Sequence, residues 1–245
     1  MCSPGEHRLG PKLSAAGSAA DLDGRGQMAK AERDACKLCL FDGCASAGRN
    51  KHREFVHCPS CGLVFVPTEY WTTAPDERAR YARHDNTENN PGYVRFLGET
   101  ANVVASMAKP GARILDFGAG ENAVLTGLLR RQGHDCTAYD PLYGLGTAAL
   151  SERYDVVVIC EVIEHLRELR EELLVLGKCV RPNGGIVVRT QCYPSLTELP
   201  TWWYARDATH INFFAPQTLV FAAGLRGMTC ETTAHPDLTV WRKQG

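Results

Sequence analysis

Short candidate strands alternate with amphipathic stretches through the second half of the chain. The candidate strands cover 112–117, 134–139, 154–160 and 185–190. The third and fourth are rich in Val and Ile, as buried parallel strands usually are. Between the strands, the stretches at 123–132 and 167–180 place apolar residues at helical spacing. This alternation predicts an α/β fold around a mostly parallel sheet.

Further elements flank this core. Helices are expected at 76–81, 93–107 and 216–223, and strands at 55–58, 63–66, 228–234 and 238–242. The helix at 93–107 is the clearest, because its apolar residues recur every three or four positions. The segment Arg181-Pro-Asn-Gly-Gly185 is typical of a turn, which is expected to separate a helix from the last parallel strand.

A glycine turn follows the first candidate strand, in the segment Asp116-Phe-Gly-Ala-Gly-Glu-Asn122. Gly118 and Gly120 lack Cβ, so the backbone can turn sharply and let a ligand approach its N–H groups. The spacing also satisfies the loose G-x-G-x-x-A fingerprint of dinucleotide-binding enzymes. The charges favour a different ligand, because Asp116 and Glu121 would repel a pyrophosphate and attract a cationic cofactor.

The glycine segment resembles the first motif of class I methyltransferases, which use S-adenosylmethionine (SAM); Asn122 stands where a third glycine is common. The resemblance extends over about 111–243. It implies a Rossmann-like sheet with an antiparallel hairpin at its C-terminal edge, and SAM as the cofactor. The expected cofactor-binding residues are Asp116, Gly118, Ala119, Gly120, Asp140 and Glu161. Asp140 ends a strand, where a carboxylate can accept hydrogen bonds from both ribose hydroxyls.

The chain departs from the family pattern between 142 and 153. This connection is too short for a helix, a strand and a second helix of ordinary length. The third strand of the family sheet is therefore expected to be abbreviated or lost, and no adenine contact is predicted.

The strand at 154–160 runs into Glu161-Val-Ile-Glu164-His165, which resembles ubiquinone-biosynthesis O-methyltransferases and their small-molecule relatives. If the segment is helical, Glu161 shares a face with Glu164 and His165. Small-RNA 3′-terminal 2′-O-methyltransferases use a similar pattern and a later histidine to hold a divalent ion. His210 is a later histidine in this chain.

Three roles are open for the set Glu161, Glu164, His165 and His210. In the first, they ligate a second divalent metal that orients and acidifies a substrate hydroxyl. In the second, a histidine is the general base and the carboxylates orient it. In the third, the histidines only hold loops together. His165, His210 and Glu164 are the expected catalytic residues.

Two C-x-x-C pairs precede the α/β region and have the spacing of a zinc ribbon: Cys36, Cys39, Cys58 and Cys61. Each pair turns two thiolates toward one ion, and two pairs complete a tetrahedron, so a structural zinc is expected. Cys44 and His57 lie nearby as candidate replacements for one ligand. The basic segment Arg49-Asn-Lys-His-Arg53 is interpreted as a solvated turn rather than a nucleic-acid contact.

The pattern divides the chain into a disordered extension at 1–30, the zinc ribbon at 31–67, a linker and helical lid at 68–110, and a SAM-binding methyltransferase domain at 111–245. Tyr81, His84 and Tyr93 are candidate lid residues; packing between ribbon and main domain is the alternative. The aromatic segment Trp202-Trp203-Tyr204 is expected to wall the acceptor pocket, although packing beneath a loop explains the tryptophans equally well.

Composition narrows the function. A formal net charge of −1 gives no overall basic field for nucleic acid. No apolar run approaches the ~18 residues of a spanning helix, and no apolar leader is apparent, so we expect a soluble, cytoplasmic protein without a membrane partner. Eleven cysteines without a secreted disulfide pattern agree with a reducing compartment.

The resemblance implies SAM-dependent transfer of a methyl group to an O, N or C atom of a small-molecule acceptor. The alternatives are an RNA or protein methyltransferase that reads its substrate with the ribbon, and a non-catalytic binding protein with the same fold. Nucleic acid is the less favoured partner because the net charge is slightly negative. A dinucleotide oxidoreductase is a lesser rival. The sequence does not indicate the assembly state.

Overall fold

The computed structural model describes residues 35–83 and 85–245. These belong to one compact unit, Arg33–Gly245. The disordered extension expected at 1–30 and the lid residue His84 lie outside the described residues. Over the described part of the chain, none of the helices combines the length and the apolar composition that crossing a bilayer requires.

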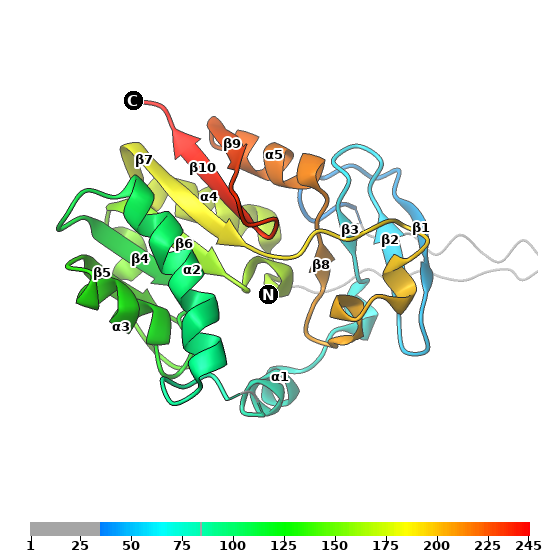
Figure 1. Cartoon of the computed structure of the whole chain (residues 1–245). Helices are drawn as coiled ribbons and strands as arrows, with labels where there is room; N and C mark the ends of the chain where they lie inside the picture. Colours follow the sequence, from blue (N-terminus) through cyan, green and yellow to red (C-terminus); the bar gives the residue numbers. More distant parts are fainter. Residues whose placement is uncertain (1–34, 84) are drawn as a thin grey trace, which may run out of the picture. The chain divides into compact units, whose positions relative to one another are not determined.

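The main sheet has six strands in the order β5-β4-β6-β7-β10-β9 (Figure 1). Their bounds are β4 Arg113–Phe117, β5 Asp135–Tyr139, β6 Tyr154–Cys160, β7 Val180–Arg189, β9 Met228–Thr232 and β10 Leu238–Lys243. Strands β5, β4, β6 and β7 pair in parallel. Strand β10 runs antiparallel to both β7 and β9. The expected mostly parallel sheet with an antiparallel edge hairpin is confirmed.

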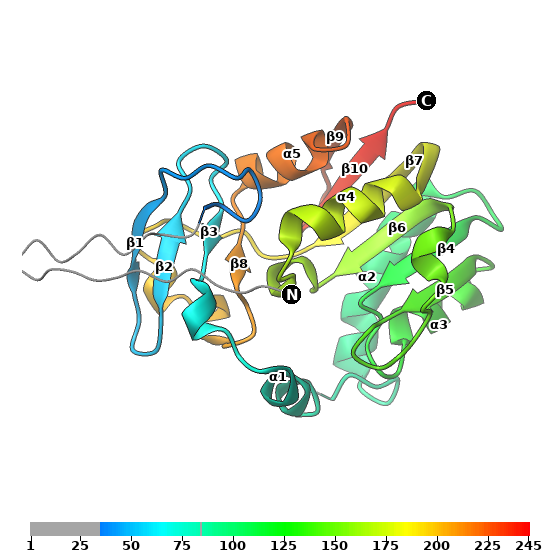
Figure 2. The same cartoon turned by 180° about the vertical axis from the view of Figure 1, so that it is seen from behind.

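Helices cover both faces of this sheet because its strands are apolar on both sides. Helices α2 (Pro91–Met107) and α3 (Val124–Arg131) pack on one face, against Ile114 of β4, and lie in front of the sheet in Figure 1. Helices α4 (Leu169–Cys179) and α5 (Pro216–Gly224) belong to the apolar cluster of the other face, with Leu115; Figure 2 shows α4 from that side. Adjacent β4 residues point to opposite faces, as the pleat requires.

No strand forms between β5 and β6 in the described chain, so β5 is an edge strand. The connection contains a tight turn, closed by the pairing of Asp140 with Leu145, and a single 3₁₀ turn at Ala149–Ser151. The expected loss of the third family strand is confirmed, and the reason is chain length.

Strand β7 begins earlier than expected. Its pairing with β6 starts at Val180, and the register is interrupted before it resumes at Gly185. Asn183 has φ +61° within this interruption. The predicted turn at 181–185 is therefore an irregularity inside a strand, because the flanking residues continue to pair with β6.

A second sheet holds the cysteine-rich segment and has the order β1-β2-β3-β8. Its strands are β1 Ala45–Arg49, β2 Glu54–His57, β3 Val64–Phe65 and β8 Asn212–Phe213. Strand β8 comes from the C-terminal half of the chain and pairs with β3. Phe55, Val64 and Phe213 pack in one apolar cluster with residues of the 199–211 region. The predicted ribbon is thus completed by a strand from a distant part of the sequence.

Arg189, at the end of β7, ties helix α2 to the C-terminal hairpin. Its guanidinium donates to Asp237 Oδ2 (2.7 Å), Glu99 Oε2 (2.8 Å) and the carbonyl of Phe96 (2.6 Å). The group lies 3.5 Å from the centroid of the Phe96 ring, and its side chain is only 5% exposed. A buried charge of this kind must be paired to be tolerated.

We predict that Arg189→Met lowers the free energy of unfolding by about 3–5 kcal/mol, because Asp237, whose side chain is only 11% exposed, is left without its partner. Urea unfolding measures this change. The matched control is Arg242→Met, which removes a half-exposed ion pair with Glu231 and should cost less than about 1 kcal/mol. Equal effects of the two substitutions would contradict the assignment.

Candidate functional site

The glycine turn at the carboxyl end of β4 forms one wall of the site. Gly118 (φ +80°) and Gly120 (φ +69°) both adopt left-handed backbone conformations that favour glycine. A Cβ on Gly118 would collide with the side chain of Val162, whereas one on Gly120 would meet no atom within 4 Å. The turn is held by β5, because the N–H groups of Gly118 and Ala119 donate to the carbonyl of Tyr139 at 2.8 and 3.1 Å.

Asp140 joins the two turns at this edge of the sheet. Its Oδ2 accepts a hydrogen bond from the Gly120 N–H at 2.9 Å, and its Oδ1 accepts from the Leu142 N–H at 3.0 Å. The residue is 8% exposed and still lines the cavity described below. A carboxylate held by two backbone donors is rigidly oriented and keeps lone pairs for a further donor.

Asp116 lies behind the turn, in the interior. Its residue is buried and its Oδ2 accepts a hydrogen bond from the Thr126 hydroxyl at 2.7 Å. Burial raises the pKa of Asp116 to about 6, with the Thr126 hydrogen bond opposing the shift. Asp116 is not among the residues that line the cavity. The expected direct cofactor contact is replaced here by a link between β4 and helix α3.

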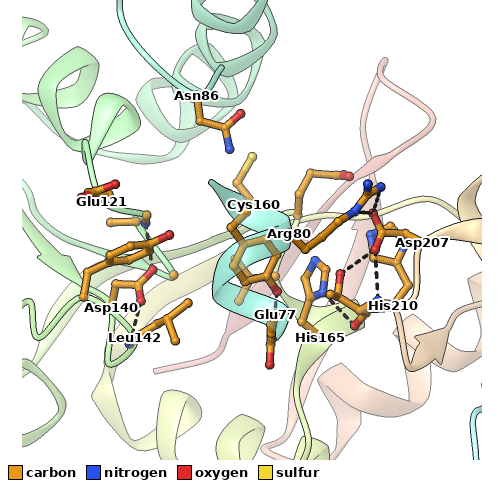
Figure 3. Close-up of a pocket in the computed structure, with 18 of the residues that line it drawn as sticks. Glu77, Arg80, Asn86, Glu121, Asp140, Leu142, Cys160, His165, Asp207 and His210 are labelled. Carbon is orange, nitrogen blue, oxygen red and sulfur yellow. Dashed lines mark hydrogen bonds and ion pairs between the residues drawn. The ribbon is translucent and has the colours of Figure 1, made fainter. Parts of the chain in front are cut away.

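One cavity of about 1110 Å³ opens at the carboxyl ends of β4, β5 and β6. Five of the expected cofactor residues line it: Gly118, Ala119, Gly120, Asp140 and Glu161. Figure 3 shows Glu121, Asp140 and Leu142 on one side of the cavity and His165, His210 and Asp207 on the other. The volume exceeds the ~300–1,000 Å³ of most single-ligand pockets.

The two histidines lie together although 45 positions separate them (210 − 165). Their ring centroids are 4.7 Å apart. Nδ1 of His165 is 2.9 Å from the carbonyl oxygen of Thr209, and Nδ1 of His210 is 2.9 Å from that of Tyr204. A carbonyl only accepts, so Nδ1 carries the proton in both rings, and Nε2 is left as an acceptor.

The segment that carries Glu161, Glu164 and His165 is not an α-helix. Glu161 has φ +53°, and a single 3₁₀ turn covers Ile163–His165. The expected shared helical face therefore does not exist. The left-handed residue re-aims the chain, so that Glu161 lines the cavity while Glu164 turns into the interior.

Tyr204 connects these two carboxyl groups. Its hydroxyl is 2.6 Å from Glu164 Oε1 and 3.2 Å from Glu161 Oε2. Thr190 donates to the other Glu164 oxygen at 3.0 Å. Glu164 is completely buried and does not line the cavity. It therefore acts beneath the surface of the site, where its orientation is fixed by two hydroxyl groups.

Burial favours the uncharged forms of Glu161 and His210. Burial raises the pKa of Glu161 to about 9, and repulsion by Glu164 adds to the shift. Burial lowers the pKa of His210 to about 3, and the neighbouring His165 contributes. The His210 ring is thus neutral at pH 7. Glu161 Oε1 is buried and has no hydrogen-bond partner among the described residues, which is rare for a buried polar atom.

Three side chains here have the composition of a metal site. One ligand atom each from Glu164, His165 and His210 lies within 4.8 Å of the other two. Nε2 of His165 is 3.9 Å from Glu164 Oε1. Glu161, the fourth residue expected in this set, is not part of the group.

The four cysteines of the predicted ribbon converge as their spacing suggested. Their Sγ atoms all lie within 4.8 Å of one another, with 3.5 Å between Cys36 and Cys61 and 3.4 Å between Cys39 and Cys58. A tetrahedral ion with Zn–S bonds of ~2.3 Å separates its sulfurs by a little under ~4 Å, so the set fits zinc. Cys44 and His57 are not members of this group.

Helix α1 (Ala74–Tyr81) borders the cavity without burying any of its own residues. Arg80 donates to Asp207 Oδ2 at 2.7 Å, and Glu77 accepts from Arg167 at 3.1 Å. The ring of Tyr81 meets the edge of His165, with centroids 5.5 Å apart. Tyr81 and Tyr93, two of the predicted lid residues, line the cavity.

The three aromatic residues at 202–204, after β7, lie in different surroundings. Trp203 lines the cavity and is 63% exposed. Trp202 packs beneath the loop, within the apolar cluster of the second sheet. Tyr204 also lines the cavity and was not among the catalytic residues expected from the sequence. Its position beside two other aromatic residues gave only the signal of a pocket wall.

Comparison with known proteins identifies the family of this chain. A family model described as a methyltransferase domain matches residues 81–232, more than half of the chain. A ubiquinone biosynthesis O-methyltransferase of Azorhizobium caulinodans is 32% identical over 120 residues, which cover 40% of this chain and 46% of that protein. One of Rickettsia bellii is 31% identical over 99 residues, or 31% of this chain and 41% of the relative. The chain spans less than half the length of these curated relatives.

Among solved structures, an O-methyltransferase family protein of Burkholderia thailandensis superposes with a TM-score of 0.51 at 18% identity, covering 70% of this chain and 61% of that one. At this identity the likeness shows the fold alone. The chain belongs to the methyltransferase domain family, and its sheet is that of a class I SAM-dependent methyltransferase.

We predict that Asp116→Asn reduces the pH dependence of stability. The folded pKa of about 6 lies above the ~3.9 of an unfolded Asp, so the folded state binds the proton more tightly. The free energy of unfolding must then fall as the pH rises from about 4 to about 6. The fall from this group is roughly 3 kcal/mol, and Asn cannot titrate.

Urea unfolding at pH 4 and pH 7 measures the difference. The control, Asp135→Asn, changes a carboxylate whose side chain is 69% exposed and should retain the wild-type pH dependence. The same fall in wild type and Asp116→Asn would show that Asp116 is not the titrating group.

Proposed function

We propose that this protein transfers a methyl group from SAM to a small molecule, most effectively to a hydroxyl oxygen. One observation carries the proposal. The glycine turn with the oriented carboxylate of Asp140 lines the same cavity as the pair of histidines, His165 and His210. The first is suited to a cationic nucleoside, and the second to an acceptor that must lose a proton. When bound, SAM would supply an electrophilic methyl group.

At the donor end, the open space over Gly120 lets a ligand approach the backbone. The carboxylate of Asp140 is held by two backbone N–H groups. We propose that it accepts hydrogen bonds from the ribose hydroxyls. Glu161 offers the unpartnered Oε1 to the ammonium group of the ligand. A positive ligand would compensate the raised pKa of Glu161, because it favours the charged carboxylate. Asp116 supports this end from behind through Thr126.

At the acceptor end, His165 and His210 present Nε2, because Nδ1 of each ring is held by a backbone carbonyl. The fixed tautomer makes both rings acceptors for a hydroxyl proton, or ligands for a cation. Trp203 and Tyr81 supply aromatic surface at the same end, which suits a planar acceptor. The chief contribution of these residues is to align the acceptor for an in-line attack.

We infer that a divalent cation fits between Glu164, His165 and His210. Two imidazole rings and a carboxyl group each place one ligand atom within 4.8 Å of the other two here, an arrangement that a cation stabilises. Thr190 and Tyr204 hold the Glu164 oxygens in the manner of outer ligands. A bound ion would lower the pKa of an acceptor hydroxyl. The low pKa of His210, about 3, favours this role over that of a general base.

We propose structural zinc at Cys36, Cys39, Cys58 and Cys61, where four sulfurs converge. The described cysteines are all free thiols. Thiolates of this kind persist in a reducing compartment, which supports the cytoplasm as the location.

The names of the curated relatives, ubiquinone biosynthesis O-methyltransferases, support an oxygen acceptor on a small molecule.

The decisive experiment supplies tritiated SAM and cell extract, and then separates metabolites from RNA and protein. Label is expected in the metabolite fraction. Label in RNA or protein would contradict the small-molecule acceptor, and absence of transfer together with absence of SAM binding would contradict the function itself.

We predict that Asp140→Ala weakens binding of S-adenosylhomocysteine about tenfold or more, because charge-assisted hydrogen bonds are worth ~1.5–3 kcal/mol each. Titration calorimetry measures the dissociation constant. The control is Asp135→Ala, at the opposite end of β5, where affinity should not change. Wild-type affinity in Asp140→Ala would remove Asp140 from the donor site.

We predict that His210→Ala lowers turnover by about 10²-fold or more while affinity for S-adenosylhomocysteine changes little.

Elemental analysis after saturation with Zn²⁺ or Mn²⁺ should find more than one metal ion per wild-type chain. The variant should retain only the ion held by the cysteines. One ion in both proteins would contradict the second metal, and unchanged turnover would leave His210 with a structural role.

A further inference from the structure

Arg53 belongs to the basic segment 49–53, which the sequence predicted to be a solvated turn. Its side chain is buried instead. It follows the β1–β2 turn and is 4% exposed, whereas Arg49 and Lys51 of the same turn are exposed. Its guanidinium lies 5.5 Å from the centroid of the Phe55 ring and 5.7 Å from that of Phe213. Burial lowers its pKa to about 10, so the group is still charged at neutral pH. A buried charge needs strong compensation.

The compensation comes from one loop in the C-terminal half of the chain, at residues 205–210. Nη1 donates to the carbonyls of His210 (2.8 Å) and Ala208 (3.2 Å), and Nη2 donates to those of Ala205 (2.8 Å) and Asp207 (2.6 Å). One side chain thus fixes four peptide groups within 205–210. The planar fork of arginine can do this, whereas the compact ammonium of lysine matches the geometry less well.

The remaining carbonyls of this loop orient the two histidines. The carbonyl of Tyr204 accepts from Nδ1 of His210, and that of Thr209 accepts from Nδ1 of His165. The carbonyls that hold the histidines are therefore direct neighbours of those that Arg53 holds: Tyr204 precedes Ala205, and Thr209 lies between Ala208 and His210. Releasing Arg53 would free the peptide groups that select the tautomer and direction of both rings.

From this adjacency we infer that Arg53 is a positioning residue for the acceptor site: it fixes, from the β1–β2 turn of the second sheet, the backbone that orients His165 and His210. The inference rests on the proposed function of the two histidines. It gives the cysteine-rich segment a role in forming the reaction site. The donor end, at Gly120 and Asp140, receives no hydrogen bond from Arg53 and should be unaffected by it.

The test compares Arg53→Ala and Arg53→Lys with the control Arg49→Ala, which removes an exposed charge from the same turn. Long-range ¹H–¹⁵N spectra of the imidazole rings report the tautomers. Signals of His165 and His210 are assigned with His165→Gln and His210→Gln. Wild type and Arg49→Ala should show the Nδ1–H tautomer at both rings. Arg53→Ala should lose it at both, and Arg53→Lys should keep it in part.

Two further measurements separate positioning from unfolding. The zinc content and the affinity for S-adenosylhomocysteine should match wild type in both Arg53 variants, while turnover should fall about tenfold or more in Arg53→Ala. Unchanged imidazole signals in Arg53→Ala would overturn the inference. A parallel loss of zinc or of S-adenosylhomocysteine affinity in Arg53→Lys would also overturn it, because the role would then be general stability.

The outcomes distinguish this inference from the function on which it rests. If Arg53→Ala loses both tautomer signals but transfers methyl groups at the wild-type rate, Arg53 orients the rings and the histidines do not serve the reaction. If the signals persist while His210→Ala is inactive, the histidines serve the reaction without the help of Arg53, and the inference fails alone.

Discussion

The parallel pairing of β4 with both β5 and β6 is the constraint on which the rest of the site depends. Phe117 pairs with Tyr139 on one side and with Ile159 on the other. Because the three strands run in the same direction and end together, the glycine turn, Asp140 and Glu161 emerge at one edge of the sheet. The buried Asp116 and Thr126 secure this edge from below by linking β4 to α3. The side of the cavity lined by Gly120 and Asp140 follows from this register.

The side of the cavity that holds His165 and His210 is built differently. It consists of loops whose peptide groups are held by side chains, because no regular ladder reaches them. Tyr204 bridges two carboxyl groups, and the carbonyls around it orient two imidazoles. The positively charged guanidinium of Arg53 donates hydrogen bonds to carbonyl groups of that loop, including those of Asp207 and His210. The site thus combines a rigid edge of a sheet with a loop fixed by one buried cation.

The second sheet therefore forms part of the wall of the site. Strand β8 pairs with β3, and the backbone of Ile211 accepts a hydrogen bond from the Val66 N–H and donates one to the Glu164 carbonyl. A fold that places the cysteine-rich segment against the cavity couples the integrity of one to the geometry of the other. Helix α1 adds a third contributor through Arg80 and Asp207, both partly accessible to solvent. Its contacts are polar, so it is held less firmly than the core helices.

The sequence by itself determined what depends on neighbouring residues. The cysteine pairs, the glycine turn, the parallel sheet and the missing third strand all follow from local spacing and chain length. Five of the six expected cofactor residues line the cavity for the same reason. Only the tertiary structure decided that Asp116 faces the interior, that Glu161 is left-handed, and that Arg53 is buried. These outcomes depend on packing between segments distant in the chain, and no local pattern encodes which charge will meet which carbonyl once they fold together.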